Sequence, residues 1–210
     1  MADSFFVRYK TPLLILGVIV LVIIMLISWI VGTYNGLVSS SQNVDGRWAD
    51  VQTQYQRRAD LIPNLVQVVA GYAKQEKTVL EDVTNARARV GQVQISAADL
   101  NDPEKLKAFQ DAQAQLGGSL SRLLAVAEAY PELKSNENFL SLQDQLEGTE
   151  NRISVSRRDF NAAVQGYNVQ VQRFPAVLVA GVLGFHPKAY FQADAGAQTA
   201  PVIDKNQLVQ

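Results

Sequence analysis

The hydrophobic pattern of the chain changes sharply near Gly32. The run from Leu13 to Val31 contains no charged side chain. At 1.5 Å per residue a helix of this length crosses a hydrocarbon core of about 30 Å, and Trp29 and Tyr34 stand where interfacial aromatic residues occur. The pattern therefore predicts a transmembrane anchor.

A cleaved secretory signal is the alternative interpretation, because Arg8 and Lys10 give the chain a basic start. The apolar run exceeds the usual signal core of about 7 to 15 residues, and no small-residue cleavage site follows Trp29. This favours an uncleaved anchor at residues 13–31. Since the first basic residue after the span is Arg47, the charge difference predicts a cytoplasmic N-terminus, residues 1–12, and a bundle outside the cytoplasm.

Beyond the anchor, apolar residues recur every three or four positions, as in amphipathic helices. The first such stripe runs from Leu37 to Val90, and the last covers residues 139–174. Between them, Asp102-Pro103-Glu104 supplies a cap, a proline and an acid that predict a helix start. No alternating run indicates a strand. We therefore expect an all-α, antiparallel up-and-down helical bundle in residues 32–191.

Pro63 lies within the first stripe and cannot donate a hydrogen bond to the carbonyl of Ala59. The stripe keeps its phase across this proline, which favours a kinked but continuous helix that runs outward to Val90. A reversal of the chain, with Asp60 as an N-cap, is the alternative. The choice decides where the last helix ends relative to the membrane.

The segment from Ala176 to Phe185 is apolar but too short to span a bilayer. With a continuous first helix we expect it far from the membrane, packed on the bundle or on a second copy, with Val179, Leu183 and Phe185 as contacts. Insertion at a membrane surface is the alternative. Residues 192–210 have little to bury, so we expect a disordered C-terminal tail.

A charged cluster around Pro63 supplies further candidate interaction residues. Arg58 falls on the apolar stripe, where a charge has to pair, and Glu150 on another helix is the expected partner. Arg57 and Asp60 are three residues apart, so we expect an ion pair on the helix surface. The alternative to a structural role is a protein-docking site at the bend, made by Arg57, Arg58, Asp60, Pro63 and Asn64.

Composition narrows the function classes. The net charge of −1 gives no basic footprint for nucleic acid, and the chain has no cysteine for disulfides or thiolate chemistry. His186 is the only histidine and lies beyond the last stripe, so no serine has an obvious base. Carboxylates on the helices lack the Glu-x-x-His partner of di-iron bundles. We therefore expect no catalytic, metal or cofactor site.

Several motifs together resemble the LemA family of bacterial membrane proteins. The resemblance covers the chain from the anchor to about Phe191 and implies a four-helix bundle on one membrane anchor. It implies no established chemistry. The motifs are Tyr34-Asn35-Gly36-Leu37-Val38, residues 57–66, Ala127-Glu128-Ala129-Tyr130-Pro131-Glu132-Leu133-Lys134, Thr149-Glu150-Asn151-Arg152-Ile153, residues 157–161 and Tyr167-Asn168.

The chain departs from this family at two positions. Gln75 stands where many relatives carry histidine, and an amide cannot act as a general base. Phe160 replaces a frequent tyrosine, which indicates packing rather than acid chemistry.

We expect a non-enzymatic, single-pass scaffold or self-assembling organiser of the envelope in the bacterial inner membrane. Its expected partners are membrane lipid, further copies of the chain and a membrane protein. The alternatives are an adaptor or regulator of a membrane enzyme such as a protease, and, less favoured, a hydrolase or metal-dependent enzyme.

Overall fold

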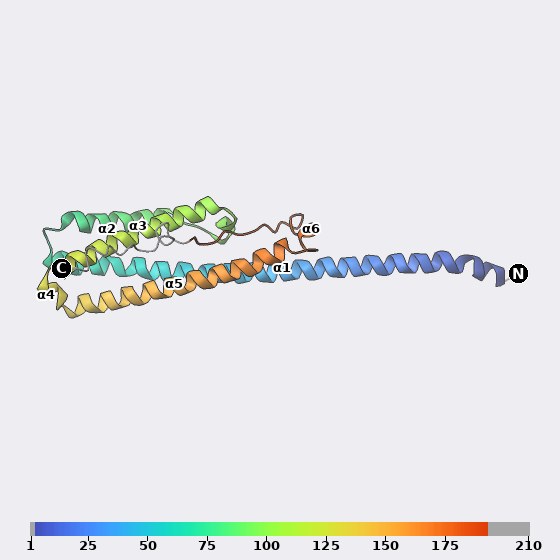
Figure 1. The fold of residues 1–210 in the computed structure, drawn as a ribbon, viewed down its shortest axis with the longest axis horizontal. Coiled ribbons are helices and arrows are strands. Elements are labelled where there is room, and N and C mark those ends of the chain that lie inside the picture. The colour runs from blue at the N-terminus through green and yellow to red at the C-terminus, as the bar shows by residue number, and fades with distance from the viewer. Residues whose placement is uncertain (1–2, 193–210) are drawn as a thin grey trace, which may run out of the picture. The chain divides into compact units, whose positions relative to one another are not determined.

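The computed structural model describes residues 3–192, with side chains from Pro12 onward, and Figure 1 gives the order of its helices. Within these residues the chain is helical and contains no strand, so the all-α prediction is confirmed. The first helix, α1, runs from Asp3 to Tyr72 and carries the apolar span. The elements that follow are α2 (Lys77–Gln92), the 3₁₀ helix η1 (Ala97–Asn101), α3 (Pro103–Glu128), α4 (Pro131–Lys134), α5 (Glu137–Gln172) and α6 (Val177–Ala180).

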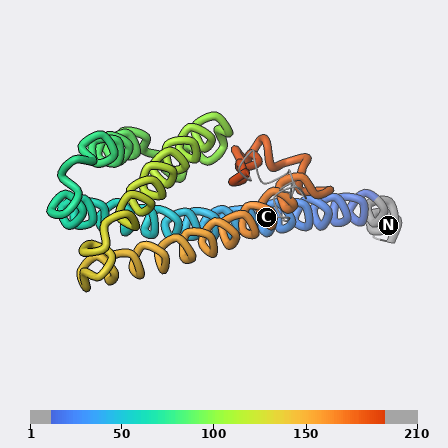
Figure 2. Tube along the Cα trace, turned by 60° about the vertical axis from the view of Figure 1, so that its left-hand side comes forward, coloured from blue at the N-terminus to red at the C-terminus, as the bar shows by residue number. Residues whose placement is uncertain are grey.

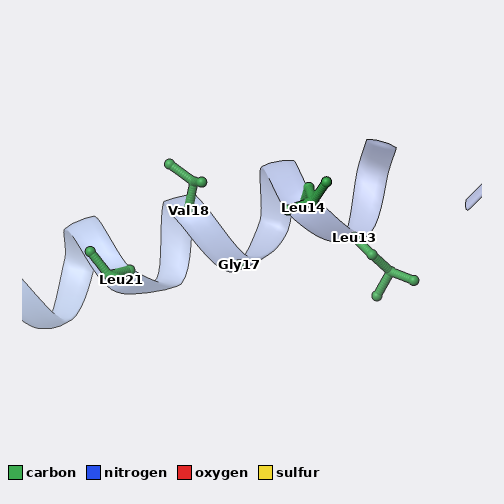
Figure 3. Close-up of a pocket in the computed structure, with 5 residues that line it drawn as sticks. All are labelled: Leu13, Leu14, Gly17, Val18 and Leu21. Carbon is green, nitrogen blue, oxygen red and sulfur yellow. The ribbon is translucent and has the colours of Figure 1, made fainter. Parts of the chain in front are cut away.

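The side chains of the apolar span point outward from α1. One window of the helix has a mean hydropathy of 3.3, and none of that window is buried inside the described chain. Figure 3 shows Leu13, Leu14, Val18 and Leu21 around Gly17, where the missing side chain leaves a shallow apolar hollow. A surface of this kind is suited to lipid, because water contact costs about 25 cal/mol per Å² of apolar area.

The chain forms two compact units. The first, here called the anchor unit, contains the described residues up to Gln52 together with Arg158–Lys188. The second, here called the bundle unit, contains Thr53–Arg157 and the described residues from Ala189 to Gln192. Both α1 and α5 contribute to each unit.

The bundle unit is built from the end of α1, from α2 and α3, and from the first part of α5 (Figures 1 and 2). One apolar core joins these elements, and it explains why the helical stripes could be identified in the sequence. Its buried members are Ile62, Leu65, Val69, Ala73, Val83, Ala86, Leu116, Leu120, Leu123, Ala127, Leu133, Phe139 and Leu146.

The α1 helix continues through Pro63, as the unbroken stripe predicted. Pro63 removes the backbone donor for the carbonyl of Ala59, and Arg87 on α2 replaces it, since Arg87 Nε donates to Ala59 O at 2.9 Å. Ile62 and Leu65 are almost fully buried and hold the helix on both sides of the proline. A side chain from a neighbouring helix therefore compensates for the missing bond.

The prediction that this helix reaches Val90 is wrong, because α1 ends at Tyr72 and α2 begins at Lys77. Two contacts from the α4 region hold the connection between them. Asn136 Nδ2 donates to Tyr72 Oη at 3.0 Å, and Tyr130 Oη donates to Glu76 Oε1 at 3.2 Å. Burial, and then the neighbouring carboxylate of Glu76, raise the pKa of Tyr130.

Two helix starts have side-chain caps. Asp102 Oδ1 accepts from the backbone N–H groups of Glu104 and Lys105, at 3.0 and 3.3 Å, which confirms the predicted start of α3. At the start of α5, Asn136 Oδ1 accepts from the backbone N–H of Phe139 at 3.0 Å. These bonds satisfy donors that the first turn of a helix leaves free.

The anchor unit pairs α1 with the end of α5. Trp48 of α1 is 1% exposed and packs against Phe160 of α5, with ring centroids 5.5 Å apart. This contact confirms that the aromatic ring at position 160 is packing material. The chain then continues through α6 and a turn at Gly184, whose φ of 83° is a conformation that favours glycine. Of the predicted disordered tail, residues 193–210 lie outside the described residues.

Candidate functional site

Arg58 lies at the centre of a polar cluster in the bundle unit. It occupies the buried stripe of α1 because Tyr55 and Ile62, three and four residues away, share its helix face. Its side chain is 5% exposed, and Nη1 donates to Glu150 Oε1 of α5 at 2.7 Å. The predicted pairing of Arg58 with Glu150 is confirmed.

A third helix contributes to the same cluster. Arg58 Nη2 donates to the backbone oxygen of Gln113 on α3 at 3.3 Å, and also to the side-chain Oε1 of Gln113. The guanidinium carbon lies 5.1 Å from the centre of the Tyr55 ring, a cation–π distance. The buried guanidinium of Arg58 thus joins α1, α3 and α5, and these bonds stabilise the packing of the three helices.

A pocket of about 260 Å³ adjoins this cluster. Two donors at the pocket, Arg58 Nε and Gln110 Nε2, are buried and have no hydrogen-bond partner within the described residues. Buried donors without a partner are rare, and water, an ion or a bound polar group can satisfy them. The residues that line the pocket are Tyr55, Arg58, Gln110, Gln113, Ala114, Gly117, Glu150, Ile153 and Arg157.

Arg157 lines the pocket and also contacts the last described residues, Phe191 and Gln192. Its Nη2 donates to the backbone oxygen of Gln192 at 3.1 Å, and its guanidinium carbon lies 4.9 Å from the centre of the Phe191 ring. The pocket therefore presents two arginines, one glutamate and free donors. Such a lining suits a hydrogen-bond acceptor such as a carboxylate or a peptide carbonyl.

The remaining residues of the predicted docking cluster lie apart from this pocket. Arg57, Asp60, Pro63 and Asn64 are all exposed on α1, whereas Arg58 alone is buried. Asp60 accepts a hydrogen bond from Gln56 Nε2 at 2.7 Å. The surface ion pair between Arg57 and Asp60 stays a prediction.

The predicted distal position of the segment 176–185 is also wrong. The Phe185 ring packs edge-on against Tyr34 of α1, with ring centroids 5.7 Å apart, next to the apolar span. Val179 and Leu183 are half-buried in the anchor unit. The reason is the reversal of the chain at residues 73–76, which adds a crossing and brings α5 back toward the anchor.

Lys188 fixes the end of this segment, a role that no sequence pattern indicated. Its side chain is 6% exposed, and Nζ donates to Asp45 Oδ1 at 2.6 Å and to Ser41 Oγ at 3.1 Å on α1. Asn168 on α5 exchanges two hydrogen bonds with the backbone of Lys188, at 2.8 and 2.9 Å. Asn168 therefore fixes this part of the C-terminal segment to α5.

The described residues contain no group of three His, Cys, Asp or Glu side chains that could hold a metal ion. His186 is exposed, and only its backbone oxygen is engaged, by Tyr167 Oη at 3.0 Å. Burial, and then the nearby Asp45 carboxylate, raise the pKa of Tyr167. The buried charges of both units are thus used to join helices and to hold the C-terminal segment.

These features define a membrane-anchored helical-bundle protein. The LemA family model matches residues 47–204, which is more than half of the chain. The chain belongs to the LemA family.

Three relatives extend this comparison. Magnetosome protein MamQ 2 of Paramagnetospirillum magneticum is 28% identical over 200 residues, covering 88% of this chain and 73% of the relative. Magnetosome protein MamQ of Magnetospirillum gryphiswaldense is 27% identical over 206 residues, covering 90% and 75%. Protein LemA of Metamycoplasma hominis is 24% identical over 163 residues, covering 78% and 70%.

Proposed function

We propose that this protein is a non-enzymatic scaffold of the cell envelope that binds protein through the pocket beside Arg58. The observation that carries the proposal is the pair of buried donors, Arg58 Nε and Gln110 Nε2, which have no partner within the described residues. A carboxylate or peptide carbonyl of a bound segment satisfies both donors. A second copy of this chain is the expected source of that segment.

The use of buried charge supports this role. Arg58 is tied to Glu150 and Gln113, and Lys188 is tied to Asp45, so both cations hold helices or chain segments in place. Rigid walls favour recognition, because a preformed pocket loses little entropy on binding. Two relatives are named magnetosome proteins and the third is named for its family, and none of these names states a chemical activity.

The test compares the full-length protein with Gln110→Leu after gentle detergent solubilisation. Gln67→Leu is the matched control, since Gln67 is exposed on α1 and does not line the pocket. Light scattering measures particle mass, and mass spectrometry identifies any co-purified chain. We expect the wild type and the control to form an assembly larger than one chain, and Gln110→Leu to weaken it at least tenfold.

Three outcomes contradict the proposal. If Gln110→Leu assembles like the wild type, the pocket holds only solvent. If all three forms are single chains without a partner, the scaffold function is wrong. An assembly of the wild type with one stoichiometric membrane enzyme instead of further copies identifies the protein as an adaptor and contradicts self-assembly.

A further inference from the structure

The C-terminal strap, defined here as residues 173–188 of the anchor unit, carries large apolar side chains that the described chain does not cover. Phe174 is 74% exposed, Leu178 is 65% exposed and Val182 is 89% exposed. Single exposed apolar residues are ordinary, but three within nine positions of one short segment are a local concentration, here called the patch. Such a patch needs a covering surface.

The strap lies beside the end of the apolar span (Figure 2). Phe185 contacts Tyr34, which follows Val31 by three residues, or about 5 Å along a helix axis. The span itself is exposed in the same way near this end, since Ile27 is 55% exposed and Val31 is 52% exposed. The strap therefore meets α1 about 5 Å beyond an exposed apolar surface that is suited to lipid.

The strap is held in this position by the contacts of Lys188. Its ammonium group is bonded to Asp45 and Ser41 of α1, and its backbone is bonded to Asn168 of α5. These bonds fix the far end of the strap, while the Phe185 contact with Tyr34 fixes the part nearest the span. Between these contacts, the tip of the strap from Phe174 to Val182 exposes its large apolar side chains.

A charged residue at the base of the patch also suits a membrane surface. Arg173 is exposed and directly precedes Phe174. Arginine next to an inserted aromatic ring is typical of interfacial segments, because the cation reaches lipid phosphates while the ring enters the acyl region.

We propose that the C-terminal strap is a second membrane contact, whose tip inserts Phe174, Leu178 and Val182 into the bilayer that α1 crosses. The strap and the span then fix the tilt of the anchor unit at the membrane surface. The occupant of the patch is lipid and not a second copy, because the strap contacts α1 at Tyr34, only three residues beyond the exposed apolar span. This inference is independent of the pocket beside Arg58.

The test uses the full-length protein, which lacks cysteine and so accepts single labels without background. Leu178→Cys and Val182→Cys carry a bimane fluorophore in vesicles of phosphatidylcholine and phosphatidylglycerol. Brominated lipid and aqueous iodide serve as the two quenchers. Met25→Cys is the lipid control and Arg47→Cys the water control, since both positions are exposed on α1, within the span and beyond it.

We expect brominated lipid to quench both strap labels nearly as strongly as the Met25 label, and iodide to quench them at least threefold less than the Arg47 label. Adding Phe174→Asp should reverse this pattern at position 182, whereas adding Val155→Asp, an exposed site on α5, should not change it. Quenching by iodide at the level of the Arg47 label overturns the inference. Protection from both quenchers, with energy transfer between labelled copies, overturns it in favour of a dimer contact.

Discussion

Arg87 on α2 supplies the hydrogen bond that Pro63 removes from α1, since Arg87 Nε lies 2.9 Å from the Ala59 oxygen. We predict that Arg87→Leu lowers the free energy of unfolding by about 0.5 to 1.5 kcal/mol, the usual value of one hydrogen bond. In a Pro63→Ala background the backbone N–H returns, so the same change should cost almost nothing. Chemical denaturation of the four proteins in detergent measures this coupling, and equal costs in both backgrounds would contradict it.

The unequal burial of Arg58 and Glu150 predicts that removing either partner lowers the free energy of unfolding by a different amount. The Arg58 side chain is 5% exposed, whereas that of Glu150 is 45% exposed. Glu150→Ala leaves a buried cation with one hydrogen-bonding partner, Gln113, and should cost about 1 to 3 kcal/mol. Arg58→Met leaves a carboxylate that water can reach and should cost less. Melting curves of the two variants that show the opposite order would refute this account.

The helical stripes were readable because burial repeats with the period of the helix. Val44, Trp48 and Val51 of α1 are all buried at the positions that the pattern marked. The partner of Arg58 was also predictable, since a cation on a buried stripe needs an opposite charge from a neighbouring helix. The buried positions follow from local spacing, and the need of Arg58 for a carboxylate follows from its place on the buried stripe.

The end of α1 was not predictable in the same way. The apolar stripe continues past Tyr72 to Val79 and Val83, and no proline marks the connection. What holds the reversal is tertiary, because Asn136 and Tyr130 reach it from far along the chain. The strap was misplaced for the same reason, since its position follows from the number of helix crossings.

No pattern in the sequence indicated that Lys188 is buried and bonded to Asp45 and Ser41. A single lysine between Pro187 and Ala189 has no spacing that indicates burial. Its pairing with Asp45 joins positions 143 residues apart. Contacts of this kind depend on the fold as a whole, and local patterns of charge do not reveal them.

Aromatic burial gives a prediction for each unit. Trp48 in the anchor unit is 1% exposed and Phe139 in the bundle unit is 4% exposed. Trp48→Ala and Phe139→Ala should each cost about 3 to 5 kcal/mol, because each leaves a cavity in a packed core. Val155→Ala, at an exposed position, is the control. Thermal melts of the full-length protein that neither large change shifts would contradict the assignment of helix faces.

The charge distribution around the span predicts the topology of the chain. Arg8 and Lys10 precede the span closely, whereas Arg47 is the first basic residue after it. We expect the protein to stay in membranes after an alkaline wash, and a reporter fused after Gln210 to be active only outside the cytoplasm. Protection of the bundle from protease in intact spheroplasts would reverse this orientation.

The lowered pKa of Asp99 predicts how the free energy of unfolding depends on pH. Hydrogen bonds from Lys105, and then from the side chain and backbone of Ser96, hold the pKa of Asp99 well below its usual value of 3.8. A carboxylate whose pKa is lower in the folded state stabilises the fold above the unfolded pKa and loses this effect as pH falls. The contribution of Asp99 should therefore be complete near neutral pH and should decline as the pH drops below about 4.

The variant Asp99→Asn isolates this contribution, because the amide keeps the shape of the side chain without its charge. Its free energy of unfolding should lie below that of the wild type at neutral pH, and the two should converge as the solution is acidified. Lys107→Ala is the control, since Lys107 pairs with Asp111 on the exposed face of α3 and does not contact Asp99. Curves that stay parallel down to the lowest pH measured would show that Asp99 has the same pKa in the folded and unfolded states.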